Sequence, residues 1–542
     1  MASLRPWRVL VADHLDEQGV ERLRREAGVE VEVRPNLDRA VLVARVGEFD
    51  ALVVRSATRV DRELLEAGRH LKVVGRAGVG VDNIDVEEAT RRGVVVVNTP
   101  EANTLAVAEH TLALMLALAR HIPRAHHHLA VERGWNRQRF MGVQLSGKTL
   151  GLVGLGRIGS EVARRARAFG MTVLAYDPYV GPERAAALGV QVVPLAELLA
   201  SSDFVSIHCP LTPRTRHLLG EAELARMKPG SYLINCARGG IVDEAALAAA
   251  LRSGRLAGAA LDVFEQEPPR ESPLWEVADR LVVTPHLGAS THEAQTDAAV
   301  QVAEDVLRVL RGEFPRHAVN LPAIPADRWP WARPYVELAR RLGRVFTELF
   351  GPSVLRRLEV VYQGELAEAP ETPALTAAVL WGILLPVLQE GVTLANASAL
   401  ASERGIQWVE TRLRSGPDAA SVAGGGPAIL LRATGPDGRR LSVGGVVVEG
   451  ECRLVEINGY RVNIEASGYL LVSSHQDKPG IIGKVGTLLG QHGINIAYMQ
   501  VGRDRPGGHA VMVVGVDSPV PEPVLLELRR IPDLWDMQAV EW

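Results

Sequence analysis

The sequence predicts an α/β protein of several domains, and two series of short apolar runs support this prediction. Between Trp7 and Val97, β-branched runs such as VLVAD, ALVVRS and GVVVV alternate with charged helical segments such as DRELLEAG. A second series of the same kind begins at Thr149. This alternation is typical of βαβ units around a parallel sheet. A length of 542 residues is too great for one hydrophobic core, so we expect three or four domains.

The composition excludes several classes of protein. Apolar residues make up 47% of the chain and charged residues 23%, which is typical of a globular protein. A net charge of −4 argues against nucleic acid as a partner. The most apolar stretch, Leu105 to Ala119, is interrupted by Glu109 and His110, so we expect a buried helix and no membrane association. The three cysteines form no CxxC pair and indicate the cytoplasm.

A glycine-rich turn opens the second series. The sequence GLGRIG supplies Gly154, Gly156 and Gly159 between the strand-like TLGLV and the helical EVARRARAF. Such glycines permit a tight turn, close approach of a pyrophosphate and close packing of the helix. Asp177 ends the next strand-like run, where a carboxylate accepts ribose hydroxyls and repels a 2′-phosphate. We therefore predict an NAD site in a Rossmann domain, in preference to a glycine turn with an incidental aspartate.

Three polar residues end later strand-like runs. Arg238 ends SYLINCAR, Glu267 follows LDVFEQ and His286 ends LVVTPH, and sites in parallel sheets lie at such strand ends. An imidazole can accept a hydroxyl proton, a carboxylate can stabilise the imidazolium, and a guanidinium can hold an α-carboxylate. Taken singly, they also fit a surface charge, a loop acid and a helix cap. Together, behind a dinucleotide fold, they predict the dehydrogenation of a 2-hydroxy acid.

These motifs resemble the D-isomer-specific 2-hydroxyacid dehydrogenases. GLGRIG, NCARGGIVDE, LDVFEQEPP and TPHLGAST are similar to that family, and the resemblance runs from about residue 7 to 320. It implies Arg238, Glu267 and His286 as a catalytic triad, with no metal. It also implies the following residues at the NAD cofactor: Gly154, Gly156, Arg157, Ile158, Gly159, Asp177, Cys209, Cys236, Ala237, Asp262 and the stretch from His286 through Leu287 to Gly288 and Ala289.

The first domain is expected to hold the substrate. VVRSAT places Arg55 and GRAGVGVDN places Arg76, both at the ends of apolar runs. Two arginines beyond Arg238 favour a second anion, and a phosphate suits arginine best. The alternative is that both arginines only brace the interdomain hinge. The remaining candidates at the substrate are Gly78, Asn103 in TPEANT, and Val79, where relatives often carry a threonine whose hydroxyl is absent here.

Within the family, the chain resembles the long members with an intervening domain and a terminal ACT domain. VVRSAT, GRAGVGVDN, HQDKPG and HGINI carry this closer resemblance. It implies NAD-dependent oxidation of 3-phospho-D-glycerate to 3-phosphohydroxypyruvate, the first step of L-serine biosynthesis, with feedback by L-serine. Two alternatives remain at this point. One is a glyoxylate or hydroxypyruvate reductase, and the other is a non-catalytic NAD-sensing regulator on the same fold.

We expect four domains in order. A flavodoxin-like substrate-binding domain comprises residues 1–100 and 291–320, and an inserted Rossmann NAD-binding domain comprises 101–290. After a proline-rich linker, a mixed α+β intervening domain that resembles an allosteric substrate-binding domain comprises 330–465. A ferredoxin-like ACT domain comprises 468–542, because its pattern is βαββαβ.

The ACT domain is expected to bind the effector L-serine. The segment HQDKPG is predicted as a turn, which puts His475 and Asp477 at a helix N-terminus, where backbone N–H groups hold a carboxylate. Asp477 offers a counter-charge to an α-ammonium, and Asn495 can bond the ligand across the gap between two copies, the arrangement that the resemblance implies. The alternative is a purely structural oligomerisation domain.

The chain is also expected to form homo-oligomers. The segment RGWNRQRFMG, residues 133–142, resembles the dimer arm of the family. The resemblance implies a dimer through the nucleotide domain and a tetramer of such dimers. Arg137 or Arg139 of the arm can then reach a neighbour's site.

Overall fold

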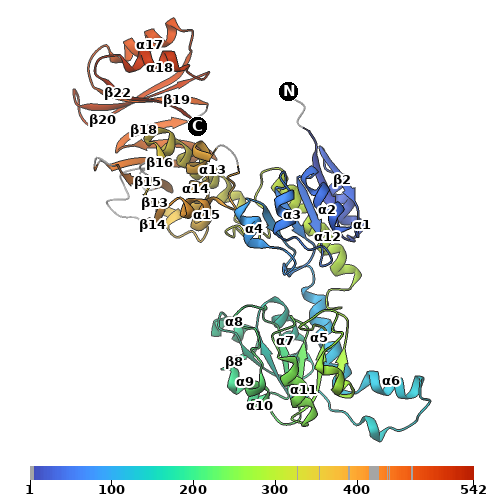
Figure 1. Ribbon diagram of the computed structural model, residues 1–542. Coiled ribbons are helices and arrows are strands. Elements are labelled where there is room, and N and C mark those ends of the chain that lie inside the picture. The colour runs from blue at the N-terminus through green and yellow to red at the C-terminus, as the bar shows by residue number, and fades with distance from the viewer. Residues whose placement is uncertain are drawn as a thin grey trace.

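The computed structural model describes residues 5–325, 327–352, 355–388, 391–413, 426–435, 438, 440–465 and 468–542. These residues form two parallel sheets, then a mixed sheet, then an antiparallel sheet, each with its own helices (Figure 1). The predicted fold class is therefore confirmed. Within these residues no single helix is long and apolar enough to cross a membrane, and α5 and α6 pass that test only as a pair bent by 62°.

The first sheet is parallel with the strand order β2-β1-β3-β4-β5, the flavodoxin-like arrangement. Its strands are β1 (Trp7–Val11), β2 (Val29–Val33), β3 (Ala51–Val54), β4 (Val73–Arg76) and β5 (Val95–Val97). Its helices each begin after an aspartate whose carboxylate accepts a backbone N–H of the first turn. They are α1 (Glu17–Arg24), α2 (Arg39–Arg45), α3 (Arg62–Ala67) and α4 (Val86–Arg91).

Helix α12 (His292–Leu310) comes much later in the chain but packs on this first sheet. Its Val302 and Val306 are fully buried in one core with Val9 and Val53 of the strands. Gly19 of α1 permits the close contact between the two helices, because a Cβ there would lie 2.5 Å from the carbonyl oxygen of Ala299. The domain of the first sheet is therefore built from two segments of the chain, one before and one after the residues of the second sheet.

The second sheet is parallel with the order β12-β11-β10-β9-β6-β7-β8, and the direction of strand addition reverses between β6 and β9. Ligands of such sheets bind at this reversal, beyond the carboxyl ends of the strands. The strands are β6 (Thr149–Val153), β7 (Thr172–Tyr176), β8 (Gln191–Val192), β9 (Phe204–Ile207), β10 (Ser231–Asn235), β11 (Leu256–Leu261) and β12 (Leu281–Val283). The helices are α5 (Thr104–Ala119), α6 (Ile122–Ala130), α7 (Arg157–Ala168), α8 (Pro182–Ala187), α9 (Leu195–Ser201), α10 (Glu221–Arg226) and α11 (Glu244–Arg252).

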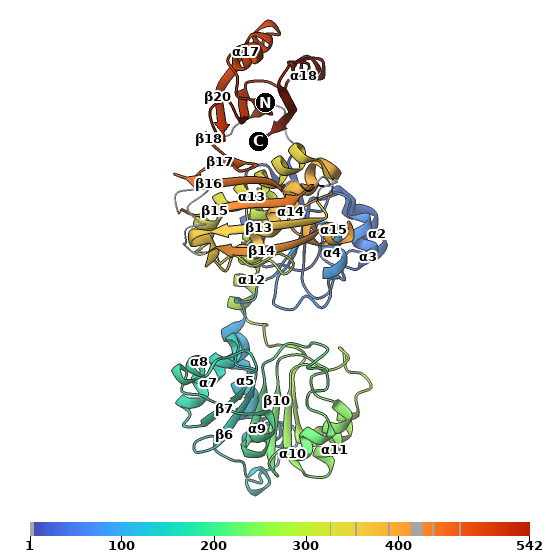
Figure 2. The same cartoon turned by 90° about the vertical axis from the view of Figure 1, so that its left-hand side faces the viewer.

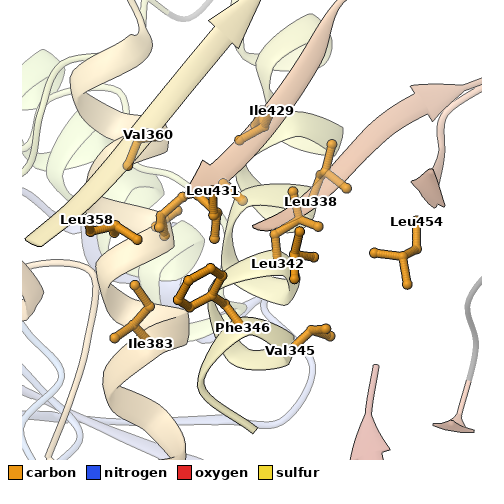
Figure 3. Close-up of a cluster of buried hydrophobic side chains, with 14 of the residues drawn as sticks. Leu338, Leu342, Val345, Phe346, Leu358, Val360, Ile383, Ile429, Leu431 and Leu454 are labelled. Atoms are coloured by element: carbon orange, nitrogen blue, oxygen red, sulfur yellow. The ribbon is translucent and has the colours of Figure 1, made fainter. Parts of the chain in front are cut away.

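The third sheet has the order β14-β13-β15-β16-β17-β18, in which only the β13–β14 pair is parallel. Its strands are β13 (Arg357–Gln363), β14 (Gln407–Leu413), β15 (Ala428–Thr434), β16 (Arg440–Val448), β17 (Glu451–Ile457) and β18 (Tyr460–Glu465). Helices α13 (Trp329–Phe350), α14 (Thr372–Leu388) and α15 (Ala397–Glu403) accompany it. Phe346 and Leu342 of α13 pack against Leu358 and Leu431 of the strands (Figure 3).

The fourth sheet is antiparallel with the order β20-β21-β19-β22. Its elements follow the predicted βαββαβ order: β19 (Tyr469–Gln476), α17 (Ile481–Gln491), β20 (Ile496–Arg503), β21 (His509–Val516), α18 (Glu522–Arg529) and β22 (Leu534–Glu541). Helices α17 and α18 cover one face. Leu470, Val472 and Val513 of the other face join the core of the third sheet, and in Figure 2 the fourth sheet lies beyond the β18 edge of the third.

The third sheet's domain is also attached to the first sheet. The loop before α15 carries Thr393, whose Oγ1 donates to the carbonyl oxygen of Gly93 at 3.1 Å. The amide of Asn396, only 1% exposed, donates to the carbonyl oxygen of Arg91 at 3.4 Å. Ala395 between them lies in the core of the first sheet. The two domains therefore share buried apolar contacts at the carboxyl end of α4.

Candidate active site

A cavity of about 660 Å³ lies between the first and second sheets. It brings together residues from β3, β4 and the start of α5 on one side with the segments after β10, β11 and β12 on the other. Of the residues predicted from the sequence, the cavity is lined by Arg55, Arg76, Gly78, Val79, Asn103, Arg238, Glu267, His286 and Ala289. The substrate candidates and the candidate triad therefore face one space.

Glu267 and His286 are directly paired in this cavity. The Nδ1 of His286 lies 2.8 Å from the Oε2 of Glu267, and the other carboxylate oxygen accepts the backbone N–H of Phe264 at 3.2 Å. The hydrogen bond to Glu267 raises the pKa of His286, against an opposing effect of burial. Burial tends to raise the pKa of Glu267, but the bond to His286 holds it below its usual value. The pair is therefore an imidazole backed by an ionised carboxylate.

Asp262 holds the turn that carries His286. Its side chain, 1% exposed, accepts the backbone N–H of Leu287 at 2.7 Å, that of Gly288 at 2.8 Å and the hydroxyl of Thr284 at 2.6 Å. Its carbonyl oxygen accepts the N–H of His286 at 3.0 Å. Asp262 and Gly288 were predicted at the cofactor, and the structure places them in this turn. Ala289 follows, and its carbonyl oxygen accepts the side chain of Gln295.

Two arginines, Arg55 and Arg76, line the cavity on the side of the first sheet. Arg76 is largely buried, and burial together with the charges of Arg238 and Arg55 lowers its pKa to about 10. Its Nε has no hydrogen-bond partner among the described residues. A Cβ at Gly78 would lie 1.5 Å from the Nη1 of Arg76, so the glycine leaves room for this side chain. A buried arginine beside two others is costly without an anion, and this favours an anionic ligand.

Arg238 connects the two walls of the cavity. Its Nε lies 3.3 Å from the Oδ2 of Asp82, and its Nη1 donates to the carbonyl oxygen of Ala237 at 2.7 Å. The side chain of Asn235 shapes this turn, because it accepts the N–H of Ala237 and donates to the carbonyl oxygen of Arg238, both at 3.0 Å. Asp82 and Asn235 were not predicted. Asp82 stands in the motif GRAGVGVDN, which was the available signal.

The glycine turn after β6 fits a dinucleotide. Gly154 has a φ of +104°, and a Cβ there would lie 2.7 Å from the backbone of His208. A Cβ at Gly159 would lie 2.3 Å from the carbonyl oxygen of Gly154. At Gly156 a Cβ would meet no described atom within 4 Å. Protein packing therefore explains the first and third glycines, whereas the open space at Gly156 fits the close approach of a pyrophosphate to the start of α7.

The other predicted cofactor residues surround this turn. Asp177 accepts the N–H of Leu155 at 2.8 Å and that of Tyr179 at 2.9 Å, so it holds the glycine turn beside the expected ribose position. Arg157 faces Glu101 across the cleft at 3.5 Å, and Ile158 packs on the core. Burial raises the pKa of Cys209 to about 11 and that of Cys236 to about 12, so both thiols are neutral.

The predicted serine-site residues do not meet within one chain. His475 is 2% exposed and lies inside β19, so the prediction of a turn at a helix N-terminus is wrong for this residue. The reason is pairing with Ala510 and Leu534, which extends β19 through Gln476. Asp477 follows the strand, and its carboxylate accepts Arg503 and the N–H of Gly507, both at 3.0 Å.

Asn495 lies at the other end of the ACT sheet. It directly precedes β20, and its amide donates to Asp517 at 2.6 Å. Because α17 runs between the end of β19 and the start of β20, Asp477 and Asn495 are separated by the length of that helix.

The predicted dimer arm extends away from the second sheet together with α6 (Figure 1). Trp135 is 78% and Met141 79% exposed, which is unusual for large apolar side chains. Arg139 lies over the ring of Phe140, and Arg137 immediately precedes the short helical turn that contains both.

Comparison with known proteins finds matches along nearly the whole chain. Family models match the NAD binding domain of the D-isomer specific 2-hydroxyacid dehydrogenases over residues 112–288, the D-3-phosphoglycerate dehydrogenase intervening domain over 332–458 and the ACT domain over 468–533. The chain is 45% identical over 535 residues to the D-3-phosphoglycerate dehydrogenase of Methanocaldococcus jannaschii, covering 98% of this chain and 99% of the relative.

Solved structures match the first two domains. A crystal structure of a protein from Thermus thermophilus is 41% identical with a TM-score of 0.54, and the match covers 58% of this chain and 99% of that one. A D-lactate dehydrogenase from Aquifex aeolicus, complexed with NAD and lactic acid, is 29% identical with a TM-score of 0.52, and the match covers 57% of this chain and 98% of that one.

Proposed function

The chain belongs to the D-3-phosphoglycerate dehydrogenases with an intervening and an ACT domain, and from that premise we propose how its cleft oxidises 3-phospho-D-glycerate to 3-phosphohydroxypyruvate. The observation that carries this proposal is one cavity that combines the Glu267–His286 pair with Arg55, Arg76 and Arg238. Gly154, Gly156 and Asp177 of the second domain would hold NAD, which when bound would supply the hydride acceptor for C2 of the substrate.

His286 is the base of the proposed reaction. Its Nδ1 is engaged by Glu267, which leaves Nε2 as the nitrogen available to the substrate hydroxyl. As the C2–H bond breaks and the hydride leaves, the O–H bond also breaks, its proton moves to Nε2, and the C2–O bond becomes a carbonyl. The carboxylate of Glu267 stabilises the imidazolium that forms. In the reverse direction the same imidazolium returns the proton.

The three arginines bind the two anionic groups of the substrate. We assign Arg238 to the α-carboxylate, because it follows β10 on the same side of the cleft as His286. We assign Arg55 and Arg76 to the phosphate, because they lie on the opposite wall, where Arg55 follows β3 and Arg76 ends β4. Charge-assisted pairs with guanidinium groups are short, strong and directional. Asn103 and the backbone at Gly78 and Val79 line the space between the arginines.

The enzyme functions in serine biosynthesis, and we propose that L-serine inhibits it through the ACT domain. The separation of Asp477 and Asn495 within one chain supports a site made by two ACT domains, with the Asp477 end of one copy facing the Asn495 end of the other. His475 is buried, so it lies beneath the surface of this site. Inhibition requires that serine bind the less active arrangement more tightly.

We further propose the assembly, the location and the domain limits. The exposed Trp135 and Met141 support a dimer through the arm, with Arg137 or Arg139 reaching the partner's cleft, and a tetramer of such dimers. The free thiols of the three cysteines fit the cytoplasm. The limits are those expected from the sequence, with residues 291–320 assigned to the first domain because α12 packs there.

The function is tested by following NADH formation with a panel of 2-hydroxy acids, each with NAD and with NADP. We expect 3-phospho-D-glycerate with NAD to give the highest kcat/KM, and His286→Ala to lose about 10²- to 10⁴-fold in kcat while it still binds NADH. A higher kcat/KM for the reduction of glyoxylate or hydroxypyruvate by NADH than for the oxidation of 3-phospho-D-glycerate would favour the reductase. NADH binding without turnover of any acid would favour the NAD-sensing regulator.

A further inference from the structure

Helix α5 links the substrate cavity to the turn that carries His286. Asn103, the residue before the helix, lines the cavity, and its Oδ1 is buried with no hydrogen-bond partner in the described part of the chain. His110 follows two helical turns later, about 10 Å along the axis and on the same side of the helix. One rigid element therefore contacts both the substrate space and the support of the proposed base.

His110 meets that support directly. Its Nε2 lies 3.2 Å from the Oδ1 of Asp262 and 3.2 Å from the Oγ1 of Thr284. Asp262 is 1% exposed, and its pKa is held down by these donors and by two backbone N–H groups, against the effect of burial. A buried carboxylate stays ionised only while such donors surround it.

The supported turn is conformationally unfavourable without help. His286 has a φ of +56°, in the left-handed region that non-glycine residues seldom adopt. Such a residue persists only where its surroundings fix it. Here Asp262 fixes it, through its carbonyl oxygen on the N–H of His286 and its carboxylate on the next two N–H groups. Whatever holds Asp262 in place therefore also sets the direction of the imidazole.

We propose that His110 is a positioning residue for the oxidation, which orients His286 through Asp262 and Thr284 and ties that orientation to the substrate end of α5. This inference rests on the proposed role of His286 as the base. A substrate that engages the start of α5 then also steadies the catalytic turn, since both contacts belong to one helix. The assignment concerns kcat and leaves the glycine turn that holds NAD untouched.

The test compares two amide substitutions in the full-length enzyme. In His110→Gln the amide nitrogen can reach the position of Nε2, whereas in His110→Asn the side chain is too short. We expect His110→Asn to lose about tenfold or more in kcat, since a lost donor to a buried charge costs about 1–3 kcal/mol. We expect His110→Gln to keep most of the activity. His70→Asn, an exposed histidine of the first domain, is the matched control.

Three further readouts separate positioning from packing. NADH affinity by fluorescence and the melting temperature should stay near the wild-type values in both variants. The acid limb of the kcat/KM profile should move in His110→Asn only, because Glu267, Asp262 and Arg238 face His286 and the first two would shift with the turn.

Wild-type kcat in His110→Asn would overturn the inference. Equal losses in both variants, in parallel with NADH affinity or melting temperature, would overturn it in favour of packing. A wild-type enzyme without turnover, or an active His286→Ala, would instead remove the proposed function and this inference with it.

Discussion

Arg238 and Asp82 come from different domains, and the Nε of Arg238 lies 3.3 Å from the Oδ2 of Asp82 across the cleft. Asp82 is 71% exposed at its side chain, and exposed ion pairs contribute only about 0–1 kcal/mol. A substrate carboxylate, which can engage the guanidinium with two oxygens, can therefore displace Asp82. We therefore expect the substrate carboxylate to replace Asp82 at Arg238.

Asp82→Asn should lower the KM for 3-phospho-D-glycerate. The amide keeps an oxygen acceptor for Arg238 but removes a negative charge that competes with the substrate for it. The expected decrease is up to about fivefold, the scale of an exposed ion pair. The measurement is a KM titration at low and high salt, with Glu87→Gln, an exposed change on α4, as control. An unchanged or higher KM would contradict the role assigned to Asp82.

Glu267→Gln should move the acid limb of the pH profile to lower pH. The hydrogen bond to Glu267 raises the pKa of His286, and His286 accepts a proton only when it is neutral. Oxidation is therefore lost as the pH falls through that raised pKa, and removal of the carboxylate lowers the pKa. The plateau kcat should fall as well, because the imidazolium loses its counter-charge. The profile of kcat/KM between pH 5 and 9 measures this, with Glu271→Gln as control, and an unmoved limb would separate Glu267 from His286.

The local parts of this site were predictable and the distant ones were not. The turn GLGRIG stands between its own strand and helix, so the pattern that identifies it is contiguous in the sequence. Asp82 and His110 act on residues more than 150 positions away, Arg238 and Asp262 respectively. No local pattern contains such a pairing. The position of His475 was predicted wrongly for the same reason. Its polar segment resembles a turn, but pairing with Ala510 and Leu534 makes it part of a strand.

Asp177→Ala should weaken NAD binding and relax the preference against NADP. The mutation removes the negative charge that opposes a 2′-phosphate and an acceptor for the ribose hydroxyls. It also removes the acceptor of the Leu155 N–H, so the glycine turn should become less rigid. Part of the loss of affinity should therefore be the same for NAD and NADP. The ratio of kcat/KM for NAD and NADP measures the selective part. An unchanged ratio would place the discrimination in other residues.

Arg55→Ala and Arg76→Ala should each raise the KM for 3-phospho-D-glycerate more than that for an unphosphorylated hydroxy acid. A lost hydrogen bond to a charged group costs about 1.5–3 kcal/mol, or about 10- to 150-fold. Arg59→Ala, outside the cavity lining, is the control for a lost charge nearby. Equal losses on both substrates would support the alternative that the arginines brace the hinge.

Asp477→Ala should raise the L-serine concentration needed for half-inhibition by about tenfold or more, because a charged partner of the α-ammonium is lost. The basal kcat should stay unchanged, since Asp477 lies in the ACT domain. The measurement is a serine titration of the wild type and the variant, with Glu522→Ala on α18 as control. Equal inhibition of both proteins, or no inhibition of the wild type at millimolar serine, would support a purely structural ACT domain.

The loop that places Ala395 in the core of the first sheet has a mechanical consequence. The ACT sheet shares its core with the intervening domain, and the intervening domain is attached to the first sheet by this loop. The two clusters inside the nucleotide domain, by contrast, contain residues between 107 and 282. The ACT, intervening and first domains are thus linked through shared buried cores, and the chain enters and leaves the nucleotide domain by the segments before α5 and before α12. We therefore expect a shift of the ACT sheet to reach the wall that carries Arg55 and Arg76 through these shared cores, and to change the position of that wall relative to the NAD-binding domain.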